Sequence, residues 1–232
     1  MENLVRRART LEQFVLECGP GCRTGRSTGR AEEVLFVLTG EGILRLAGSE
    51  YPLELESGAY LAPDQHYELE NAGSGPLRIV AVRLPDPERA PAGAPRQVVR
   101  RLADQEAHAA TTEREFRIVA DPTTGLRSAT HFVGYIPRTR APEHFHTYEE
   151  VIYVLDGEGV LHADGTHRPV RAGSTIELPA GKMHCLENTG QQVMRVVAVF
   201  RPTGSPAAAY YPDGTPAYPG TPPNCPSPAW RC

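Results

Sequence analysis

Short apolar segments separated by turn residues run through most of this chain. Residues 34–38 read VLFVL and residues 151–155 read VIYVL, and each segment leads into a Gly-Glu-Gly turn. A second apolar segment follows each turn, ILRL at residues 43–46 and VLHA at residues 160–163. Short β-branched and aromatic runs bounded by glycine are typical of β-hairpins, and long helical periodicity is absent. The pattern predicts an all-β fold built as a sandwich or barrel.

The same unit occurs twice along the chain. EEVLFVLTGEGILRL beginning at Glu32 matches EEVIYVLDGEGVLHA beginning at Glu149, an offset of 117 residues. Downstream, residues 56–75 parallel residues 171–192 in the same order. A repeat of this length indicates two copies of one supersecondary unit, and a chain of 232 residues can close two compact cores.

The repeats divide the chain into four segments. We expect a first domain at 1–84, a linker and entry segment at 85–110, a second domain at 111–202 and a Pro-rich tail at 203–232. The Pro/Ala-rich start of the linker cannot form a central strand, and RQVVRRLADQEAHAAT at 96–111 is the main helical candidate. The tail is either disordered or an extended arm over the barrels, with tyrosines at 210, 211 and 218 as possible anchors.

Charge and composition limit the partners and the compartment. The formal net charge is −4 and the isoelectric point is near 6.1, so no overall basic field attracts nucleic acid. No run of 18 apolar residues is present, and the first residues have no signal-peptide core, which predicts a cytoplasmic protein without a membrane segment. The five cysteines have no paired C-x-x-C spacing, and we expect them to be reduced thiols.

The most informative residues lie in the stretch GYIPRTRAPEHFHTYEE. His144 and His146 are two residues apart, so on a strand both imidazoles point to the same side, roughly 6.6 Å apart along the chain. Glu150 follows four residues after His146, another even separation. Its side chain joins the same face if the alternation of side chains continues along the strand, or if a bend at residues 147–148 preserves it. Glu149 is one step off and should face away.

A second stretch, GSTIELPAGKMHCLEN, supplies one more candidate ligand. Pro179 and Gly181 shape a turn that delivers His184 at the start of a new strand. A cluster of buried histidines and a carboxylate costs several kcal/mol unless the groups are paired or bind an ion. These two stretches therefore predict one divalent-metal site in the second half of the chain.

The two stretches resemble the two motifs of the cupin superfamily, G-x5-H-x-H-x3-E-x6-G and G-x5-P-x-G-x2-H-x3-N. Gly157 ends the first motif, and the second runs from Gly173 to Asn188. The resemblance implies a bicupin, with two tandem cupin barrels of the jelly-roll or double-stranded β-helix type. It also implies that the metal ligands are His144, His146, Glu150 and His184, with Glu150 as the candidate catalytic residue.

The first half of the chain departs from these motifs at the ligand positions. Ser27, Gly29 and Tyr67 stand where the second half has its three histidines, and only Glu33 keeps its type. Serine and glycine cannot replace imidazole as strong ligands. We therefore expect a first barrel without metal, which serves in packing, in dimer formation or in lining a second pocket.

Three imidazoles and one carboxylate leave an octahedral divalent ion with open positions for an anionic substrate and a second reactant. The ligand types do not distinguish Fe, Mn, Ni, Zn and Cu. Arg138 and Arg140, on the approach to His144, and Tyr135 are candidate substrate contacts. The prediction is a metal-dependent enzyme with one ion per chain that acts on a small anionic organic molecule, as a dioxygenase-type oxidoreductase.

Two other readings of the site stay open. A non-redox cupin enzyme, such as an isomerase, a decarboxylase or an enzyme similar to ureidoglycine aminohydrolase, would need the same ligands. A non-catalytic module that binds or senses a small ligand would also use such a barrel. In each case we expect a small-molecule partner and a homodimer, because paired cupins cover the open sheet edges and apolar outer faces of the barrels.

Overall fold

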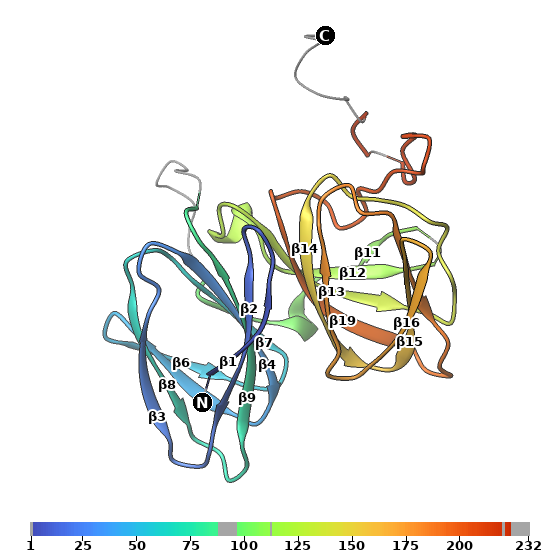
Figure 1. The fold of residues 1–232 in the computed structure, drawn as a ribbon. Coiled ribbons are helices and arrows are strands. Elements are labelled where there is room, and N and C mark those ends of the chain that lie inside the picture. Colours follow the sequence, from blue (N-terminus) through green and yellow to red (C-terminus); the bar gives the residue numbers. More distant parts are fainter. Residues whose placement is uncertain (1, 88–96, 112, 220, 224–232) are drawn as a thin grey trace.

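The computed structural model describes residues 2–87, 97–111, 113–219 and 221–223, and it contains two β-barrels side by side (Figure 1). The strands of the first barrel are β1 (Glu2–Arg7), β2 (Glu12–Cys18), β3 (Arg23–Ser27), β4 (Glu32–Thr39), β5 (Gly42–Leu46), β6 (Ser49–Leu53), β7 (Ser57–Leu61), β8 (His66–Asn71), β9 (Leu77–Leu84) and β10 (Val99–Arg101). Those of the second are β11 (His108–Ala109), β12 (Glu115–Ala120), β13 (Thr130–Ile136), β14 (Glu149–Asp156), β15 (Glu158–Ala163), β16 (Thr166–Arg171), β17 (Thr175–Leu178), β18 (His184–Asn188) and β19 (Met194–Arg201). The described helical segments are short 3-10 turns, η1 (Leu102–Asp104) and η2 (Pro122–Thr124). The all-β prediction is confirmed.

The repeat in the sequence is also a repeat in the sheets. One sheet of the first barrel has the order β1-β2-β9-β4-β7-β10, and its counterpart has the order β11-β12-β13-β19-β14-β17. Smaller sheets, β3-β8-β5-β6 and β16-β15-β18, close the barrels. The β4–β9 register slips between Val37 and Thr39, and the β14–β19 register slips at the matching place, between Val154 and Asp156. Five strands of each large sheet therefore follow the same order, down to this irregularity, whereas β10 and β11 are added at opposite edges and β3 has no counterpart in the smaller sheet of the second barrel.

Strands β4 and β14 are buried on both faces, which explains why their sequences do not alternate. Leu35 and Ile152 point into the interiors of their barrels, whereas Val34 and Val151 pack in a cluster shared by the two barrels. A strand that is covered on both faces reads as a continuous apolar run. Each fully buried side chain of this size contributes about 1.5–3 kcal/mol.

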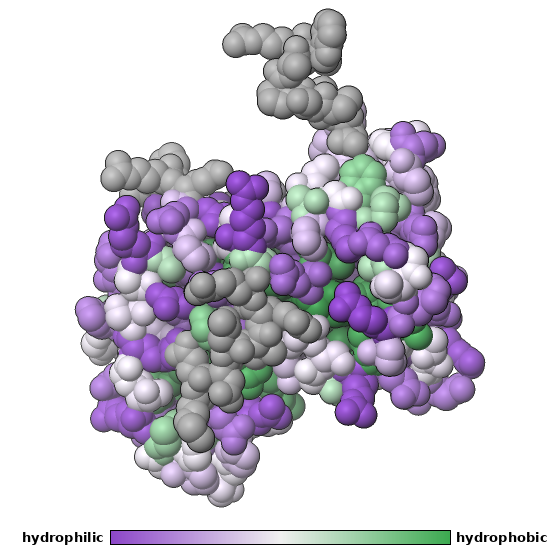
Figure 2. Space-filling model, viewed as in Figure 1, coloured by the Kyte–Doolittle hydropathy of each residue, from purple (hydrophilic) through white to green (hydrophobic). Residues whose placement is uncertain are grey.

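The barrels meet across two apolar clusters to which both contribute. One includes Leu11, Val34 and Tyr60 with Leu126, Val151 and Val199, and the other includes Phe36 and Val80 with Val133 and Val197. Figure 2 shows a mostly hydrophilic face on which apolar residues come into view mainly in the middle, between the barrels. Burial of these surfaces favours a fixed arrangement of the two barrels.

Two buried carboxylates add polar contacts across this interface. Glu32 accepts hydrogen bonds from the backbone N–H (3.2 Å) and the hydroxyl (2.5 Å) of Ser128, just before β13. Glu149 accepts from the backbone N–H and hydroxyl of Thr10 (2.6 Å each), just before β2. Because Glu32 and Glu149 are equivalent in the repeat, these two sets of contacts are related by an approximate two-fold axis. As expected from the sequence, Glu149 faces away from the cavity, toward the other barrel.

The helix predicted for 96–111 is wrong over the described part of that segment. Residues 99–101 form strand β10, which pairs with β7 of the first barrel, and residues 108–109 form β11 of the second. Leu102 is buried, and Val98 and Val99 pack against the first core. Pairing with an open sheet edge therefore outweighs the local helix propensity. The segment expected as a linker contributes to both barrels, and residues 88–96 lie outside the described residues.

The thiols of Cys18 and Cys22 are joined in a disulfide, so the expectation of reduced thiols is wrong for this pair. The bond links the end of β2 to the residue before β3. Cys185 is a free, buried thiol, and Cys225 and Cys232 lie outside the described residues. Among the described residues, no helix is long and apolar enough to cross a membrane.

Candidate metal centre

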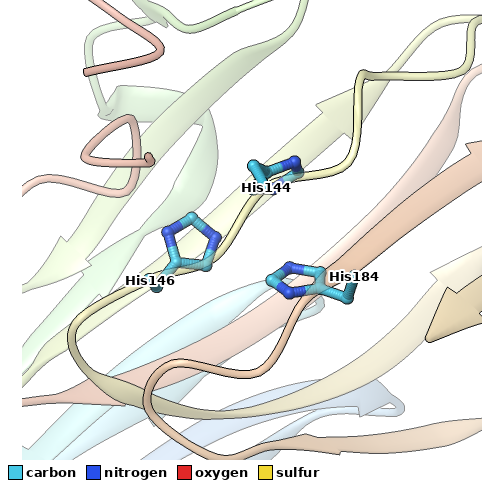
Figure 3. A group of neighbouring side chains, drawn as sticks. All are labelled: His144, His146 and His184. Atoms are coloured by element: carbon cyan, nitrogen blue, oxygen red, sulfur yellow. The ribbon is translucent and has the colours of Figure 1, made fainter. Parts of the chain in front are cut away.

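Three histidines converge inside the second barrel. His144 and His146 lie on the segment that leads into β14, and His184 begins β18. Backbone hydrogen bonds pair His144 with His184 in both directions, at 3.1 and 2.9 Å. The predicted strand through His144 and His146 is limited to bridges at His144 and Phe145, and a bend at residues 147–148 precedes β14. One candidate ring nitrogen from each histidine lies within 4.8 Å of the others, and Figure 3 shows the rings around one space.

The other nitrogen of each ring is held by a backbone carbonyl. Nδ1 of His144 lies 2.8 Å from the carbonyl oxygen of Pro142, that of His146 lies 2.7 Å from Ala208 O, and that of His184 lies 2.9 Å from Lys182 O. A carbonyl oxygen only accepts, so each Nδ1 carries the hydrogen and each Nε2 keeps its lone pair. This is the support that metal-binding histidines usually have.

Burial keeps the three rings neutral. Desolvation lowers the pKa of His144 and His146, and it lowers the pKa of His184 to about 3. Nearby positive charge is a smaller cause in the same direction: Arg114 acts on His144 and His184, and neighbouring histidines act on His146 and His184. Three neutral imidazoles with free lone pairs turned to one space fit a divalent transition metal.

Glu150 lines the same cavity but is not part of the group of converging nitrogens. It is buried on β14, and desolvation raises the pKa of its carboxyl to about 8. Tyr148 lies beside it, and its ring stacks on His146, with ring centroids 4.5 Å apart. A divalent ion at the three histidines would favour the ionised carboxylate and bring the pKa of Glu150 down.

The rest of the cavity wall is mostly apolar, with one arginine that the sequence did not reveal. The apolar part includes Phe116, Phe132, Ile152, Leu161, Leu178 and Val196. Arg114, which precedes β12, lines the cavity and donates to the backbone carbonyl of Leu186, while its Nε has no partner among the described residues. Burial lowers the pKa of this guanidinium. No motif marks Arg114, because its contact with Leu186 joins residues that are 72 positions apart in the sequence.

The structure does not bring the arginines expected from the sequence to the cavity. Arg138 is exposed and donates to Gln191, and Arg140 is exposed and forms a backbone bridge with Glu187. Neither is among the cavity-lining residues. Tyr135 does line the cavity, and its ring also lies 5.9 Å from the guanidinium of Arg117.

In the first barrel an arginine occupies the position that corresponds to the histidine cluster. Arg26 Nε donates to the Tyr67 hydroxyl (2.7 Å), and its Nη2 donates to Glu33 Oε1 (3.3 Å). The Tyr67 hydroxyl donates to the same oxygen at 2.8 Å. Burial raises the pKa of Glu33, and the positive charge of Arg26 opposes that rise. The guanidinium therefore supplies the positive charge that an ion would supply.

The asparagine that closes the second motif has the same structural role in both barrels. The side-chain amides of Asn71 and Asn188 each donate to two backbone carbonyls, at 2.8 Å. Each side-chain oxygen accepts from the backbone N–H two residues later, at 2.9 Å. Because the metal-free arrangement in the first barrel has identical bonds, this residue shapes the turn and does not orient a ligand.

Of the predicted tail, residues 203–219 and 221–223 are described, and the part up to Tyr210 lies as an arm over the second barrel. Tyr210 pairs with Phe145 through two backbone hydrogen bonds, at 2.9 and 3.0 Å, and the rings stack at 5.5 Å. Pro206, Ala207 and Ala209 line the cavity. Since Ala208 also holds His146, the arm both covers the cavity and fixes one ligand. Residues 220 and 224–232 lie outside the described residues.

The first motif departs from the cupin pattern at its opening position, because Arg138 stands where the pattern has glycine. The family described as Cupin domain nevertheless matches residues 131–200. An oxalate-binding protein of Thermotoga maritima is 40% identical over 51 residues, which are 22% of this chain and 42% of that protein. The chain thus spans about two fifths of the length of the first curated relatives that it matches.

Solved structures agree with the two-barrel arrangement. YlbA of E. coli has a TM-score of 0.72 at 14% identity, covering 86% of this chain and 81% of that one. A variant of the Bacillus subtilis oxalate decarboxylase has a TM-score of 0.72 at 15% identity, covering 92% and 74%. Identities this low show the fold alone. Residues 131–200 of the second barrel thus match the cupin domain family, and the chain as a whole has the two-barrel fold of these solved structures.

Proposed function

We propose that the chain is a metal-dependent enzyme that acts on a small organic anion in its second barrel, with dioxygenase-type oxidation as the reaction class. The observation that carries the proposal is the set of three neutral imidazoles that converge inside a cavity also lined by Arg114. A purely structural ion is more often enclosed by four protein ligands. Here one side of the space opens to a cavity of about 100 Å³.

The residues have separate roles in this proposal. His144, His146 and His184 would hold one divalent ion, and Glu150 would join them as a carboxylate ligand when it ionises. Such an ion supplies Lewis acidity or holds a second reactant such as dioxygen beside the substrate. Glu150, with a pKa near 8 before an ion binds, can also take up or release a proton inside the cavity.

The cavity wall indicates the kind of substrate. Arg114 offers guanidinium N–H groups that match a carboxylate, in a site where burial strengthens the pairing. The apolar residues around it suit the hydrocarbon part of the same molecule, so the proposed substrate is a carboxylate with an apolar body. The tail segment at residues 206–209 shields this space from water.

Two other functions remain candidates on the same site. The oxalate-binding relative and the oxalate decarboxylase fold support a small carboxylate ligand, and they favour either binding without turnover or a non-redox reaction. A decarboxylase, an isomerase or a ureidoglycine aminohydrolase-like enzyme would use the same ligands. Oxygen uptake linked to product formation separates the oxidative proposal from these.

The test is a screen of metal-loaded protein against aromatic and aliphatic carboxylates, with product formation and oxygen uptake followed together. Arg114→Gln should raise KM at least about tenfold while the metal content stays unchanged, because one charged hydrogen-bond pair is worth about 1.5–3 kcal/mol. Arg138→Gln, outside the cavity, should leave KM unchanged. Turnover without oxygen uptake would move the assignment to a non-redox enzyme, and binding without turnover would move it to a binding module.

Assembly and compartment stay predictions. We propose a homodimer, because short strands β1, β10, β11 and β17 stand at sheet edges. A monomeric mass by light scattering at micromolar concentration would contradict this proposal. The cytoplasm is likewise proposed, and cell fractionation tests it.

A further inference from the structure

A second pair of histidines lies on the outer face of the small sheet of the second barrel. His162 on β15 stands directly opposite His167 on β16. Leu161 and Ala163, the neighbours of His162, point into the barrel core, so His162 points outward. Glu187 on β18 reaches the same face from the other side of β15. These three side chains are separate from the cavity-lining residues.

The contacts among these side chains fix the state of His162. Its Nε2 lies 2.7 Å from Glu187 Oε2, and its Nδ1 lies 2.6 Å from His167 Nδ1. A carboxylate accepts, so Nε2 of His162 carries a hydrogen and, in the neutral ring, Nδ1 presents a lone pair. Two ring nitrogens this close share one hydrogen. A metal ion bound by both nitrogens would lie off the line between them, so the exposed ring of His167 would turn toward it.

We propose that His162 and His167 form a second, peripheral binding site for a divalent transition metal, with Glu187 as the residue that orients His162. A carboxylate behind a ligand histidine is the usual support for a metal-binding imidazole. His162 is 8% exposed and so is fixed by its surroundings, whereas His167 is exposed. Water can therefore complete the coordination, and the ion would clamp β16 to β15.

The spacing of the two nitrogens favours one group of metals. Two ligand nitrogens at 2.0–2.1 Å from an ion are about 2.9 Å apart when the angle at the ion is 90°, and about 3.3 Å apart in a tetrahedron. The observed 2.6 Å needs only a few tenths of an ångström of opening to reach the first value. Cu²⁺ and Ni²⁺ adopt such tetragonal arrangements with nitrogen and oxygen ligands. Cu²⁺ also binds a given set of nitrogen ligands more tightly than Zn²⁺ in the general order of divalent metals, so Cu²⁺ is the ion with which to test the site.

Titration of the full chain with Cu²⁺, followed by calorimetry and electron paramagnetic resonance, tests the proposal. The wild type should bind about two ions, and His167→Ala should bind about one. His66→Ala, which removes an exposed histidine of the first barrel, should still bind about two. Glu187→Gln should weaken the peripheral ion about 10–100-fold without changing the ion count, because it removes the orienting carboxylate.

The double variant His144→Ala/His146→Ala separates this site from the cavity site. The double variant should still bind one Cu²⁺, and the resonance spectrum of that ion should show hyperfine splitting from nitrogen ligands. Adding His167→Ala to the double variant should abolish this binding. If His167→Ala binds Cu²⁺ with the same count and affinity as the wild type, the peripheral site does not exist. That result would leave the cavity site and its proposed chemistry unaffected, since the cavity ion is counted separately.

Discussion

The two barrels share one strand plan, yet they treat the same buried glutamate differently. In the first barrel, Glu33 is paired with the guanidinium of Arg26 and the hydroxyl of Tyr67. In the second, Glu150 has a raised pKa with burial as its cause, and three neutral imidazoles face the same cavity. Burial raises the pKa of the glutamate in both barrels, but only in the first do two arginines, Arg26 and Arg83, oppose that rise with positive charge. The first barrel has that charge built in, and the second leaves room for an ion.

A one-residue change in strand position produces the difference. Tyr67 and His184 are equivalent in the repeat, but Tyr67 pairs with Arg26 whereas His184 pairs with His144. Counting along the sequence alone would place Ser27 opposite Tyr67. Because β3 is a regular strand and the segment at His144 is not, the pairing differs by one residue. Arg26, and not Ser27, therefore takes the place that His144 has in the second barrel.

The largest expected effect comes from removing the built-in cation. Arg26→Ala should lower the free energy of unfolding by about 3 kcal/mol, because it removes the nearer of the two arginines that compensate the buried Glu33 and leaves only Arg83, 3.9 Å from Glu33 Oε2. Urea unfolding at neutral pH measures this loss. Arg23→Ala, which removes an arginine of the same strand whose side chain is half exposed, should change stability by less than about 1 kcal/mol.

The double variant Arg26→Ala/Glu33→Gln should recover most of that loss, since the carboxylate that lost its nearer arginine is gone as well. If Arg26→Ala lowered the free energy of unfolding as little as Arg23→Ala, the guanidinium of Arg26 would not be a main source of stability in the interior of the first barrel.

A pH experiment distinguishes the two sides of the interface between the barrels. His131 on β13 and Gln13 on β2 are equivalent buried positions, and only His131 titrates. Burial lowers the pKa of His131 to about 3, so its contribution to stability is present above its unfolded value near 6.5 and is lost as the pH falls. At pH 5 the loss is roughly 2 kcal/mol.

His131→Gln should therefore flatten the acid side of the stability curve by about that amount, measured by urea unfolding from pH 7.5 to 5. Gln13→Leu should keep the wild-type slope. Identical slopes for His131→Gln and the wild type would mean that His131 does not stay neutral in the interface.

The smallest expected effect compares the two glutamates directly in metal-free protein. Glu150→Gln should change the free energy of unfolding by less than about 1 kcal/mol at neutral pH, because the carboxyl is largely protonated there and glutamine resembles that form. Glu33→Gln should cost about 1–3 kcal/mol, because it weakens the bonds from Arg26 and Tyr67. Equal costs, measured by chemical denaturation with chelator present, would show that the two carboxylates have the same environment.

Local sequence was sufficient for the repeated hairpins and for the three histidines. The runs at β4 and β14 and the turns that follow them are short-range features, and the spacing of His144 and His146 brings both rings to one side. The ligand role of Glu150 stays a prediction, because its carboxylate is outside the group of converging nitrogens.

Residues placed by distant contacts were beyond sequence reasoning. Arg114 lines the cavity and donates to the backbone carbonyl of Leu186, and Ala208 meets His146 only because the arm pairs with Phe145. Strand β10 forms where a helix was predicted because β7 offers an open edge. Each depends on a partner far away in the chain, and no local pattern records it.

We expect one ion in the second barrel and none in the first. Metal analysis of chelator-washed, reloaded and gel-filtered full-length protein tests this most directly, since a buried ion is retained while an exposed one exchanges. We predict about one ion per chain for the wild type and for Glu33→Gln, and close to none for His144→Ala/His146→Ala. Retention of the ion by the histidine double variant, or a wild-type count near two that falls by one in Glu33→Gln, would contradict the account.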